Sequence, residues 1–236
     1  MTCNGGGGDM HHHYRAHSDR SSSHGQITRL VRQVNRGPVL DVGAAQGILG
    51  QMLKDTNLAV DAIEPHPAWA EAARPHYRNV FNCSIENANG LPDRYSVVIC
   101  GDVLEHTADP VAALRKLRAY AADDAVFVVS LPNVAHLSVR LLLLCGLFPR
   151  MQRGILDRTH LQFFTRRTAI AMLRDAGLRV ERVSATPVPL DEVSRTSPGN
   201  PLFRLAMKLQ KICVSLLPRV FGYQFVFVAR PGAPAR

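Results

Sequence analysis

The stretch GPVLDVGAAQGILG, residues Gly37–Gly50, joins an apolar run that ends in an acid to a loop of small residues. The run PVLDV is short and mostly apolar, as a buried strand is, and the residues after Gly47 follow a helical pattern. A glycine-rich turn between a strand and a helix lets the backbone approach a ligand closely. The stretch therefore predicts an α/β fold with a nucleotide-type ligand at the end of its first strand.

Strands and helices alternate on both sides of this loop. A helix precedes it, with Ile27, Leu30, Val31 and Val34 on one face. Further strands are expected at 58–64, 79–83, 94–102, 124–132, 178–185 and 223–230, and further helices at 48–55, 67–77, 109–121, 134–147, 166–176 and 201–218. This alternation predicts an α/β sheet with mostly parallel order.

Two kinds of ligand fit a loop at this position. Glu64 lies 21 positions after Gly43, at the end of the second strand, where a carboxylate can accept both hydroxyls of a ribose. A dinucleotide also needs a third glycine for close helix packing, and neither Leu49 nor Gly50 completes that fingerprint. S-adenosylmethionine has no phosphate, and its sulfonium and amino-acid tail suit an acid such as Asp41.

These residues resemble those of class I S-adenosylmethionine-dependent methyltransferases. The segments VLDVGAAQGILGQML and VDAIEPHP are similar to the first two motifs of that family, and YSVVICGDVLEH is similar to its fourth strand. The resemblance runs in order over 38–230 and implies a Rossmann-like, doubly wound seven-stranded sheet with an antiparallel last strand and a helical insertion after strand five. It also implies that the donor is held by Asp41, Gly43, Ala45, Gly47, Glu64, Ser84, Ile85 and Gly101.

Several of these positions follow from their place in the family fold. Gly101 ends the fourth strand, where the backbone faces the methionine part of the donor, and Ser84 and Ile85 follow the third strand and flank the adenine. Ala45 departs from the usual GxGxG loop of the family. Its extra methyl group is tolerated where the local φ is negative.

Two further segments resemble narrower groups of methyltransferases. GDVLEHTADP is similar to the O-methyltransferases of ubiquinone biosynthesis, and GILDRTHLQFFTRRTAIAMLRDAGL is similar to bacterial relatives that modify sugars or lipids of the cell envelope. Both imply O-methylation of a small-molecule, sugar or lipid-linked hydroxyl. Two alternatives are a non-catalytic protein that binds S-adenosylmethionine and an NAD-dependent oxidoreductase on a Rossmann fold.

Methyl transfer to a hydroxyl needs a general base or a metal ion, because the oxygen must lose its proton. His106 follows the fourth strand and His160 lies in the insertion after the fifth, so both are candidate bases. The alternatives are that His106 caps or packs a helix and that the loop around His160 is held by internal hydrogen bonds. Asp102, Glu105 and His106 are the candidate ligands of a divalent cation, but local capping or pairing by Glu105 is favoured, so we expect no metal.

The composition is that of an ordinary soluble domain, with 46% hydrophobic and 20% charged residues in a chain of 236. Residues 1–20 are expected to be a disordered tail, and 21–236 a single domain in which 133–165 and 186–218 cover the acceptor side. The five cysteines are scattered and never spaced as CxxC, which favours a reducing cytoplasm over disulfides or a zinc site. The polar N-terminus predicts no signal peptide.

The basic charge of the chain leaves its partners open. A net charge of +9 fits nucleic acid, an anionic membrane or acidic substrates, but sparse aromatic interleaving and the lack of a base-flipping motif argue against nucleic acid. One apolar helical face opposes Arg204, Lys208 and Lys211 and consists of Leu202, Leu205, Ala206, Leu209, Ile212, Cys213 and Leu216. This face either covers the acceptor pocket or lies on the inner face of an anionic membrane. The sequence does not indicate an oligomeric state.

Overall fold

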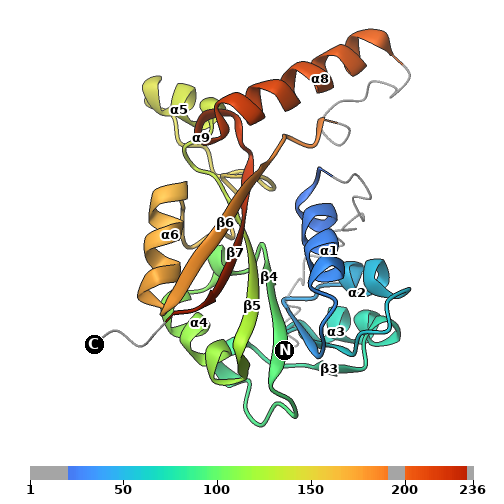
Figure 1. The fold of residues 1–236 in the computed structure, drawn as a ribbon. Helices are drawn as coiled ribbons and strands as arrows, with labels where there is room; N and C mark the ends of the chain where they lie inside the picture. The colour runs from blue at the N-terminus through green and yellow to red at the C-terminus, as the bar shows by residue number, and fades with distance from the viewer. Residues whose placement is uncertain (1–20, 191–199, 233–236) are drawn as a thin grey trace, which may run out of the picture.

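The computed structural model describes residues 21–190 and 200–232, so the tail predicted at 1–20 lies outside the described residues. Its strands form one seven-stranded sheet in the order β3-β2-β1-β4-β5-β7-β6 (Figure 1). These strands are β1 (Val39–Val42), β2 (Val60–Ile63), β3 (Asn79–Phe81), β4 (Tyr95–Gly101), β5 (Ala121–Pro132), β6 (Leu178–Thr186) and β7 (Gln224–Pro231). The helices are α1 (Ser23–Val34), α2 (Ile48–Leu53), α3 (Pro67–Ala73), α4 (Pro110–Ala119), α5 (Leu137–Leu144), α6 (Arg166–Asp175), α8 (Pro201–Leu216) and α9 (Pro218–Phe221). Three short 3₁₀ turns complete the described elements: η1 (Arg74–His76), η2 (Ile85–Asn87) and η3 (Leu104–His106).

The strand directions confirm the predicted sheet. The first five strands run parallel, and β7 enters between β5 and β6 and is antiparallel to both. From β1 the chain proceeds to β2 and β3 on one side and returns to β4 and β5 on the other. This reversal puts the switch point of the sheet between β1 and β4, which is where ligands bind in open α/β sheets.

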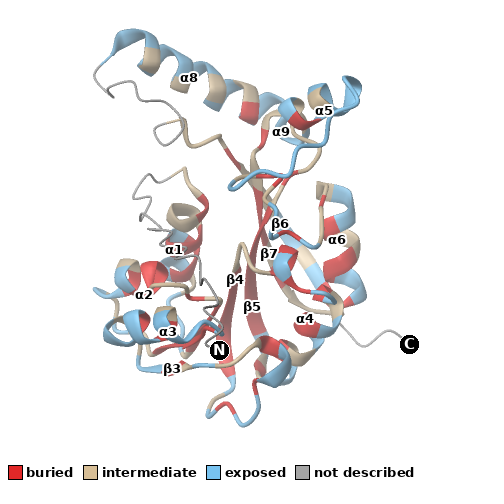
Figure 2. Cartoon of the chain, turned by 180° about the vertical axis from the view of Figure 1, so that it is seen from behind, coloured by how far each residue is buried: buried red, intermediate tan, exposed pale blue. Residues whose placement is uncertain are grey.

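Two layers of helices bury the sheet, whose strands form the buried centre in Figure 2. On one face α1 and α2 pack their apolar residues on β1 and β4, through Ile27, Leu30, Leu49, Leu53, Val39, Val97 and Ile99. On the other face α4 and α6 pack on β4, β5 and β7, through Leu114, Leu117, Met172, Leu173, Val98, Phe127 and Phe227. The central strands β1 and β4 are mostly apolar on both faces, as expected of strands that are covered on both sides.

Side-chain caps begin α4 and α6. The Asp109 carboxylate accepts the backbone N–H of Ala112 at 2.9 Å and Pro110 takes the first position of α4. The Thr165 and Thr168 hydroxyls cap α6 reciprocally. These caps fix the start of each helix relative to the strand or loop before it.

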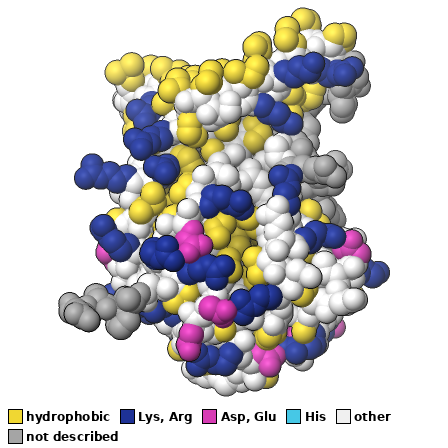
Figure 3. All heavy atoms as spheres, viewed as in Figure 1, with side chains coloured by type: hydrophobic (Ala, Val, Ile, Leu, Met, Phe, Trp, Pro, Cys, Tyr) yellow, Lys and Arg dark blue, Asp and Glu magenta, His cyan; other side chains and the backbone are white. Residues whose placement is uncertain are grey.

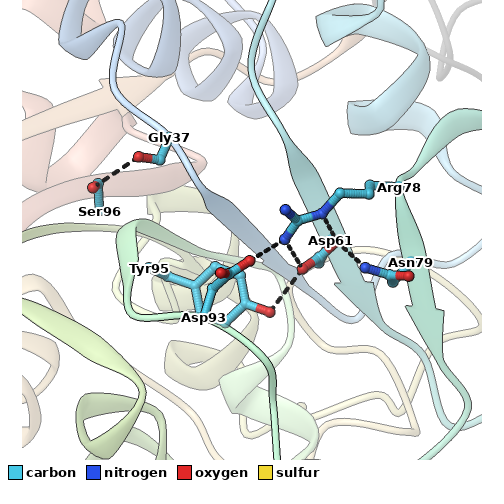
Figure 4. A network of polar contacts seen from close by, with 7 residues as sticks. All are labelled: Gly37, Asp61, Arg78, Asn79, Asp93, Tyr95 and Ser96. Atoms are coloured by element: carbon cyan, nitrogen blue, oxygen red, sulfur yellow. Dashed lines mark hydrogen bonds and ion pairs between the residues drawn. The ribbon is translucent and has the colours of Figure 1, made fainter.

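A polar network ties the strands together near their amino ends (Figure 4). Asp61 of β2 is fully buried and accepts hydrogen bonds from Arg78, Asn79 and Tyr95, at 2.9, 3.0 and 2.9 Å. Arg78 also pairs with Asp93. Burial alone raises the pKa of Asp61, but these donors outweigh it and hold the pKa below its usual value. The network fixes β2 against β3 and β4 on the side of the sheet away from the ligand loop.

Three predicted elements had a boundary wrong by three residues or more. The helix expected at 67–77 ends at Ala73 and is followed by the 3₁₀ turn η1. The apolar helix expected at 134–147 is limited to Leu137–Leu144, because the Val134 N–H bonds the Phe164 carbonyl and Gly146 has a left-handed φ of +71°. Strand β5 begins at Ala121 rather than at 124, since Ala121 pairs with Tyr95 of β4.

The two segments expected to cover the acceptor side lie beyond the carboxyl ends of the parallel strands. Figure 1 places α5 and α8 there, across the end of the sheet that carries the ligand loop. The apolar face of α8 does not point into the core, because Leu205 and Leu209 are 52% and 53% exposed. Within the described residues, no helix is both long and apolar enough to span a bilayer.

Candidate functional site

The loop after β1 adopts three left-handed conformations in five residues. Gly43, Ala45 and Gly47 have φ values of +72°, +48° and +89°. A Cβ at Gly43 would lie 2.3 Å from the Val103 side chain, and one at Gly47 would lie 2.8 Å from the His76 ring. Glycine is therefore required at both ends of the loop for space as well as for backbone conformation.

Ala45 lies between these glycines in a conformation that the sequence did not predict. The condition under which its methyl group is tolerated, a negative φ, is not met, since the loop turns left-handed at this residue too. The Ala45 N–H donates to Oε2 of Glu64 at 2.8 Å. This hydrogen bond joins the loop to the end of β2. It explains the left-handed backbone of Ala45, because that conformation points the Ala45 N–H at the Glu64 carboxylate.

Glu64 is the acid that the sequence assigns to the donor ribose. Its side chain is only 3% exposed, and its Oε1 accepts the His66 N–H at 2.8 Å while Oε2 accepts Ala45. Each carboxylate oxygen has two acceptor sites, so both oxygens keep one for a ribose hydroxyl. The two backbone donors fix the orientation of the carboxylate at the carboxyl end of β2.

Asp41 lies behind the loop. It is 1% exposed, and its Oδ2 accepts the Tyr77 hydroxyl at 2.5 Å. Tyr77 in turn accepts the Gly50 N–H at 3.0 Å, and a Cβ at Gly50 would lie 2.6 Å from the Tyr77 ring. Burial, opposed by the Tyr77 hydrogen bond and assisted by the charge of Glu64, raises the Asp41 pKa to about 7. The contacts of Asp41 hold the start of α2, and its contact with the donor stays a prediction.

The remaining donor positions lie at the carboxyl ends of β3 and β4. Ser84 precedes η2, and the Ile85 side chain is 5% exposed and packs in the core, so it can offer only its backbone to an adenine. Gly101 ends β4 between Ile27 of α1 and Leu49 of α2. The structure brings all these positions to one edge of the sheet, and their individual donor contacts stay predictions.

The two candidate bases lie side by side, although 53 residues separate them in the sequence. The ring centroids of His106 and His160 are 4.9 Å apart. The Glu105 carbonyl accepts the N–H groups of Leu161 and Gln162, at 2.8 and 3.0 Å, and this docks the insertion on η3. No sequence signal predicted this pairing, which depends on how the insertion folds back over β4.

Hydrogen bonds to the backbone define which ring nitrogen of each histidine is basic. Nδ1 of His106 lies 3.2 Å from the Thr159 carbonyl oxygen, and Nδ1 of His160 lies 3.1 Å from the Ile155 carbonyl oxygen. A carbonyl oxygen can only accept, so each Nδ1 carries the hydrogen and each Nε2 keeps a lone pair. Burial, and then the neighbouring His106, lower the pKa of His160 and favour its neutral, proton-accepting form.

Glu105 lies next to His106 and His160 and forms a cluster with them. It is 1% exposed, and neither carboxylate oxygen has a hydrogen-bond partner among the described residues. One ligand atom each from Glu105, His106 and His160 lie within 4.8 Å of one another. Burial, and then the charge of Asp102, raise the pKa of Glu105 well above its usual value.

The structure groups the candidate cation ligands differently from the sequence, and their binding of a cation stays untested. Asp102 has a φ of +54° and accepts the Ser130 hydroxyl at 2.7 Å through Oδ1, which engages it with β5. His160 stands in its place in the cluster. Two imidazoles with free Nε2 atoms and an unpartnered carboxylate fit the ligand set of a transition ion better than that of Mg²⁺.

The segment that carries Glu105 and His106 reaches the loop after β1. Val103, which precedes η3, packs against Gly43, so the segment that carries Glu105 and His106 touches the turn after β1. The loop after β1, Glu64 and the imidazoles of His106 and His160 therefore lie together at one edge of the sheet. This arrangement suits transfer from a bound nucleoside donor to an acceptor under the insertion.

Solved structures share this fold over most of the chain. A SAM-dependent methyltransferase from Archaeoglobus fulgidus aligns with a TM-score of 0.59 and 16% identity, covering 90% of this chain and 96% of that one. The 1,6-didemethyltoxoflavin-N1-methyltransferase of Burkholderia thailandensis, with bound S-adenosylhomocysteine, aligns with a TM-score of 0.59 and 16% identity, covering 90% and 80%. These neighbours share with this chain the fold of S-adenosylmethionine-dependent methyltransferases.

The chain belongs to the methyltransferase domain family, whose model matches residues 13–183. A curated relative, the ubiquinone biosynthesis O-methyltransferase of Aeromonas salmonicida (strain A449), is 27% identical over 158 residues. This match covers 62% of the chain and 64% of the relative, so the chain spans just under two thirds of the relative's length.

Proposed function

We propose that this protein transfers the methyl group of S-adenosylmethionine to a hydroxyl of a small-molecule, sugar or lipid-linked acceptor. The observation that carries the proposal is the pair of imidazoles, His106 and His160, each with Nδ1 bonded to a carbonyl and Nε2 free. A hydroxyl needs such a base, because an alcohol is a weak nucleophile until its proton leaves. The similarity to O-methyltransferases of ubiquinone biosynthesis supports the same acceptor atom.

The step is an in-line displacement. The acceptor oxygen attacks the methyl carbon, the carbon–sulfur bond breaks, and its electron pair stays on sulfur to give S-adenosylhomocysteine. The hydroxyl proton passes to Nε2 of one imidazole. His160 is the better acceptor of this proton, because its lowered pKa keeps it neutral near pH 7. Holding donor and acceptor in line supplies the rest of the acceleration.

Glu105 has a positioning role in this scheme. Its carboxyl group lies beside both imidazoles, in a place that water does not reach. An imidazolium formed during transfer favours the carboxylate form of Glu105, which opposes the burial that raises the Glu105 pKa, and the two charges stabilise each other. A divalent cation bound by Glu105, His106 and His160 would lower the pKa of a bound hydroxyl, but the imidazoles can perform the proton transfer alone.

The test compares donor binding with turnover. Purified protein is titrated calorimetrically with S-adenosylmethionine and with NAD, and labelled donor is then incubated with a crude extract of acceptors. We expect binding of S-adenosylmethionine, label in a base-stable ether product, and equal activity after treatment with a chelator. Binding of NAD alone would support an oxidoreductase, and donor binding with no transfer to any acceptor would support a non-catalytic binding protein.

Variants then assign the base. We expect His160→Ala or His106→Ala to lower turnover by about 10²- to 10⁴-fold while the dissociation constant of S-adenosylmethionine is unchanged. The matched control is His136→Asn, a histidine of the same insertion whose ring caps α5, a role that asparagine also fills. Full activity in both alanine variants would contradict base catalysis by these histidines. The positioning of donor and acceptor would then be the only source of the acceleration that this scheme retains.

A further inference from the structure

Helix α8 presents three separate faces along its 16 residues. Phe203, Met207, Gln210 and Val214 form a buried or half-buried face, from which Gln210 donates to the Val188 carbonyl. A second face carries Arg204, Lys208 and Lys211. The third is apolar and exposed by 52–75% at its large side chains: Leu202, Leu205, Leu209, Ile212 and Leu216. Among the residues that the structure describes, only the first of these faces packs on the domain.

The insertion adds a second set of exposed apolar side chains. Leu141, Leu143 and Leu144 of α5 are 53%, 51% and 83% exposed, and Leu147 and Phe148 follow at 54% and 43%. Figure 3 shows hydrophobic side chains continuous along the end of the molecule formed by α5 and α8. We name these five residues, together with the four exposed leucines and the one exposed isoleucine of α8, the apolar rim. A contiguous exposed patch of this kind marks an interaction surface in soluble proteins.

Positive charge lies next to the apolar rim. Residues 200–223 contain Arg204, Lys208, Lys211 and Arg219 and no acidic residue. Residues 133–165 contain four arginines and one acid, Asp157. In Figure 3 lysines and arginines lie just below the hydrophobic edge. The surface therefore places apolar side chains outermost and cations one layer behind them.

We propose that the apolar rim docks this protein on an anionic lipid bilayer. Apolar side chains of an amphipathic helix enter the boundary between headgroups and acyl chains, and flanking cations meet the anionic headgroups. A second copy of the chain is a poorer occupant, because a two-fold contact would bring its cations against the same cations. Docking would hold the carboxyl edge of the sheet, with His106 and His160, toward the membrane.

This inference goes beyond the proposed function and does not depend on methyl transfer. Its test uses the full chain without donor, so failure of docking and failure of catalysis are separate results. Binding is measured by co-sedimentation with phosphatidylcholine vesicles and with vesicles that also contain phosphatidylglycerol. We expect binding to the anionic vesicles only, and release as salt is raised from about 0.1 M to about 1 M, which shortens the screening length from about 10 Å to about 3 Å.

Two pairs of substitutions separate charge from apolar contact. Arg204→Gln with Lys208→Gln is expected to weaken binding about 30-fold, from about fivefold for each cation near the surface. Leu205→Ser with Leu209→Ser is expected to weaken it at least about tenfold, through lost burial in the interface. The matched control is Lys54→Gln with Arg94→Gln, two exposed cations beyond the amino ends of the strands, which should leave binding unchanged.

Four results would overturn the proposal. The first two are equal binding to neutral and anionic vesicles, and no binding to either. The third is that the control variant Lys54→Gln with Arg94→Gln binds vesicles as weakly as the α8 variants. The fourth is that Leu205→Ser with Leu209→Ser binds vesicles as well as the unaltered protein. Light scattering of the protein without vesicles adds a further arm. A dimer that the serine pair dissociates, with vesicle binding intact, would assign the apolar rim to a second copy of the chain. Far-ultraviolet circular dichroism checks that each variant is folded.

Discussion

Replacement of Asp41 by asparagine should remove a large pH dependence of stability. Burial raises the Asp41 pKa from 3.8 to about 7 in the folded protein. The folded state therefore keeps a proton that the unfolded chain loses near pH 4. The contribution of Asp41 to the free energy of unfolding therefore falls as pH rises through this window, by about 1.4 kcal/mol per pH unit, and is constant above pH 7. Over about three units the loss is about 4 kcal/mol.

Asparagine keeps the acceptor for the Tyr77 hydroxyl and cannot ionise. The free energy of unfolding of Asp41→Asn minus that of the natural protein should therefore increase by about 3 kcal/mol between pH 5 and pH 7 and then level off. Taking this difference cancels the histidines and Glu105, which titrate in both proteins. Urea denaturation followed by the fluorescence of Trp69, the single tryptophan, measures it at each pH.

The matched control is Asp55→Asn at the surface. Asp55 pairs with Arg32, which holds its pKa below the usual value, so it is ionised in both states above pH 5. The difference for this variant should be constant from pH 5 to pH 8. A constant difference for Asp41→Asn as well would refute the reasoning, because it would mean that burial behind the loop leaves the carboxyl group ordinary.

Three further predictions concern the loop and the base. Ala45→Gly should raise the free energy of unfolding by about 0.5–1 kcal/mol in thermal melts, since the relief of a left-handed alanine exceeds the entropy cost of glycine; a loss of stability would contradict this. Gly43→Ala should lower it by about 3 kcal/mol and weaken donor binding more than about tenfold by calorimetry, because its Cβ meets Val103; unchanged binding would show that the loop moves freely. The acid limb of the pH profile of kcat/KM should lie below pH 6.5, because the pKa of His160 is lowered. His106→Asn should move this limb to higher pH, because it removes a neighbour that lowers the His160 pKa. A limb well above pH 6.5 would assign the base to another residue.

The sequence predicted the sheet because its signals are local. Buried parallel strands appear in the sequence as short apolar runs. Capped helices begin at residue types that are common at helix starts, such as Asp109 and Pro110. The antiparallel β7 followed from the family resemblance, since one strand alone does not reveal its direction. The positive φ of Ala45 has no local sequence signal, because it accompanies a hydrogen bond to Glu64 at the end of another strand.

The chemistry of the site was only half predictable. His106 and His160 were each recognisable as candidate bases, but their contact depends on the insertion folding onto the Glu105 carbonyl. The bond between Asp102 and Ser130 could not be predicted either, because it joins the residue after β4 to a residue of β5. Tyr77, which supports Asp41, carries no sequence signal, because tyrosines in short helices are usually ordinary packing residues.

The place of β7 has a consequence for how the chain folds during its synthesis. β7 is made after every other strand of the sheet, yet it is the only strand that pairs with β6 among the described residues. Until residues 224–231 leave the ribosome, β5 keeps an open edge and β6 has no partner. Unpaired edges of this kind invite aggregation. The protein should therefore tolerate truncation after β5 and before β7 poorly, and depend on chaperones in the interval before β7 is inserted.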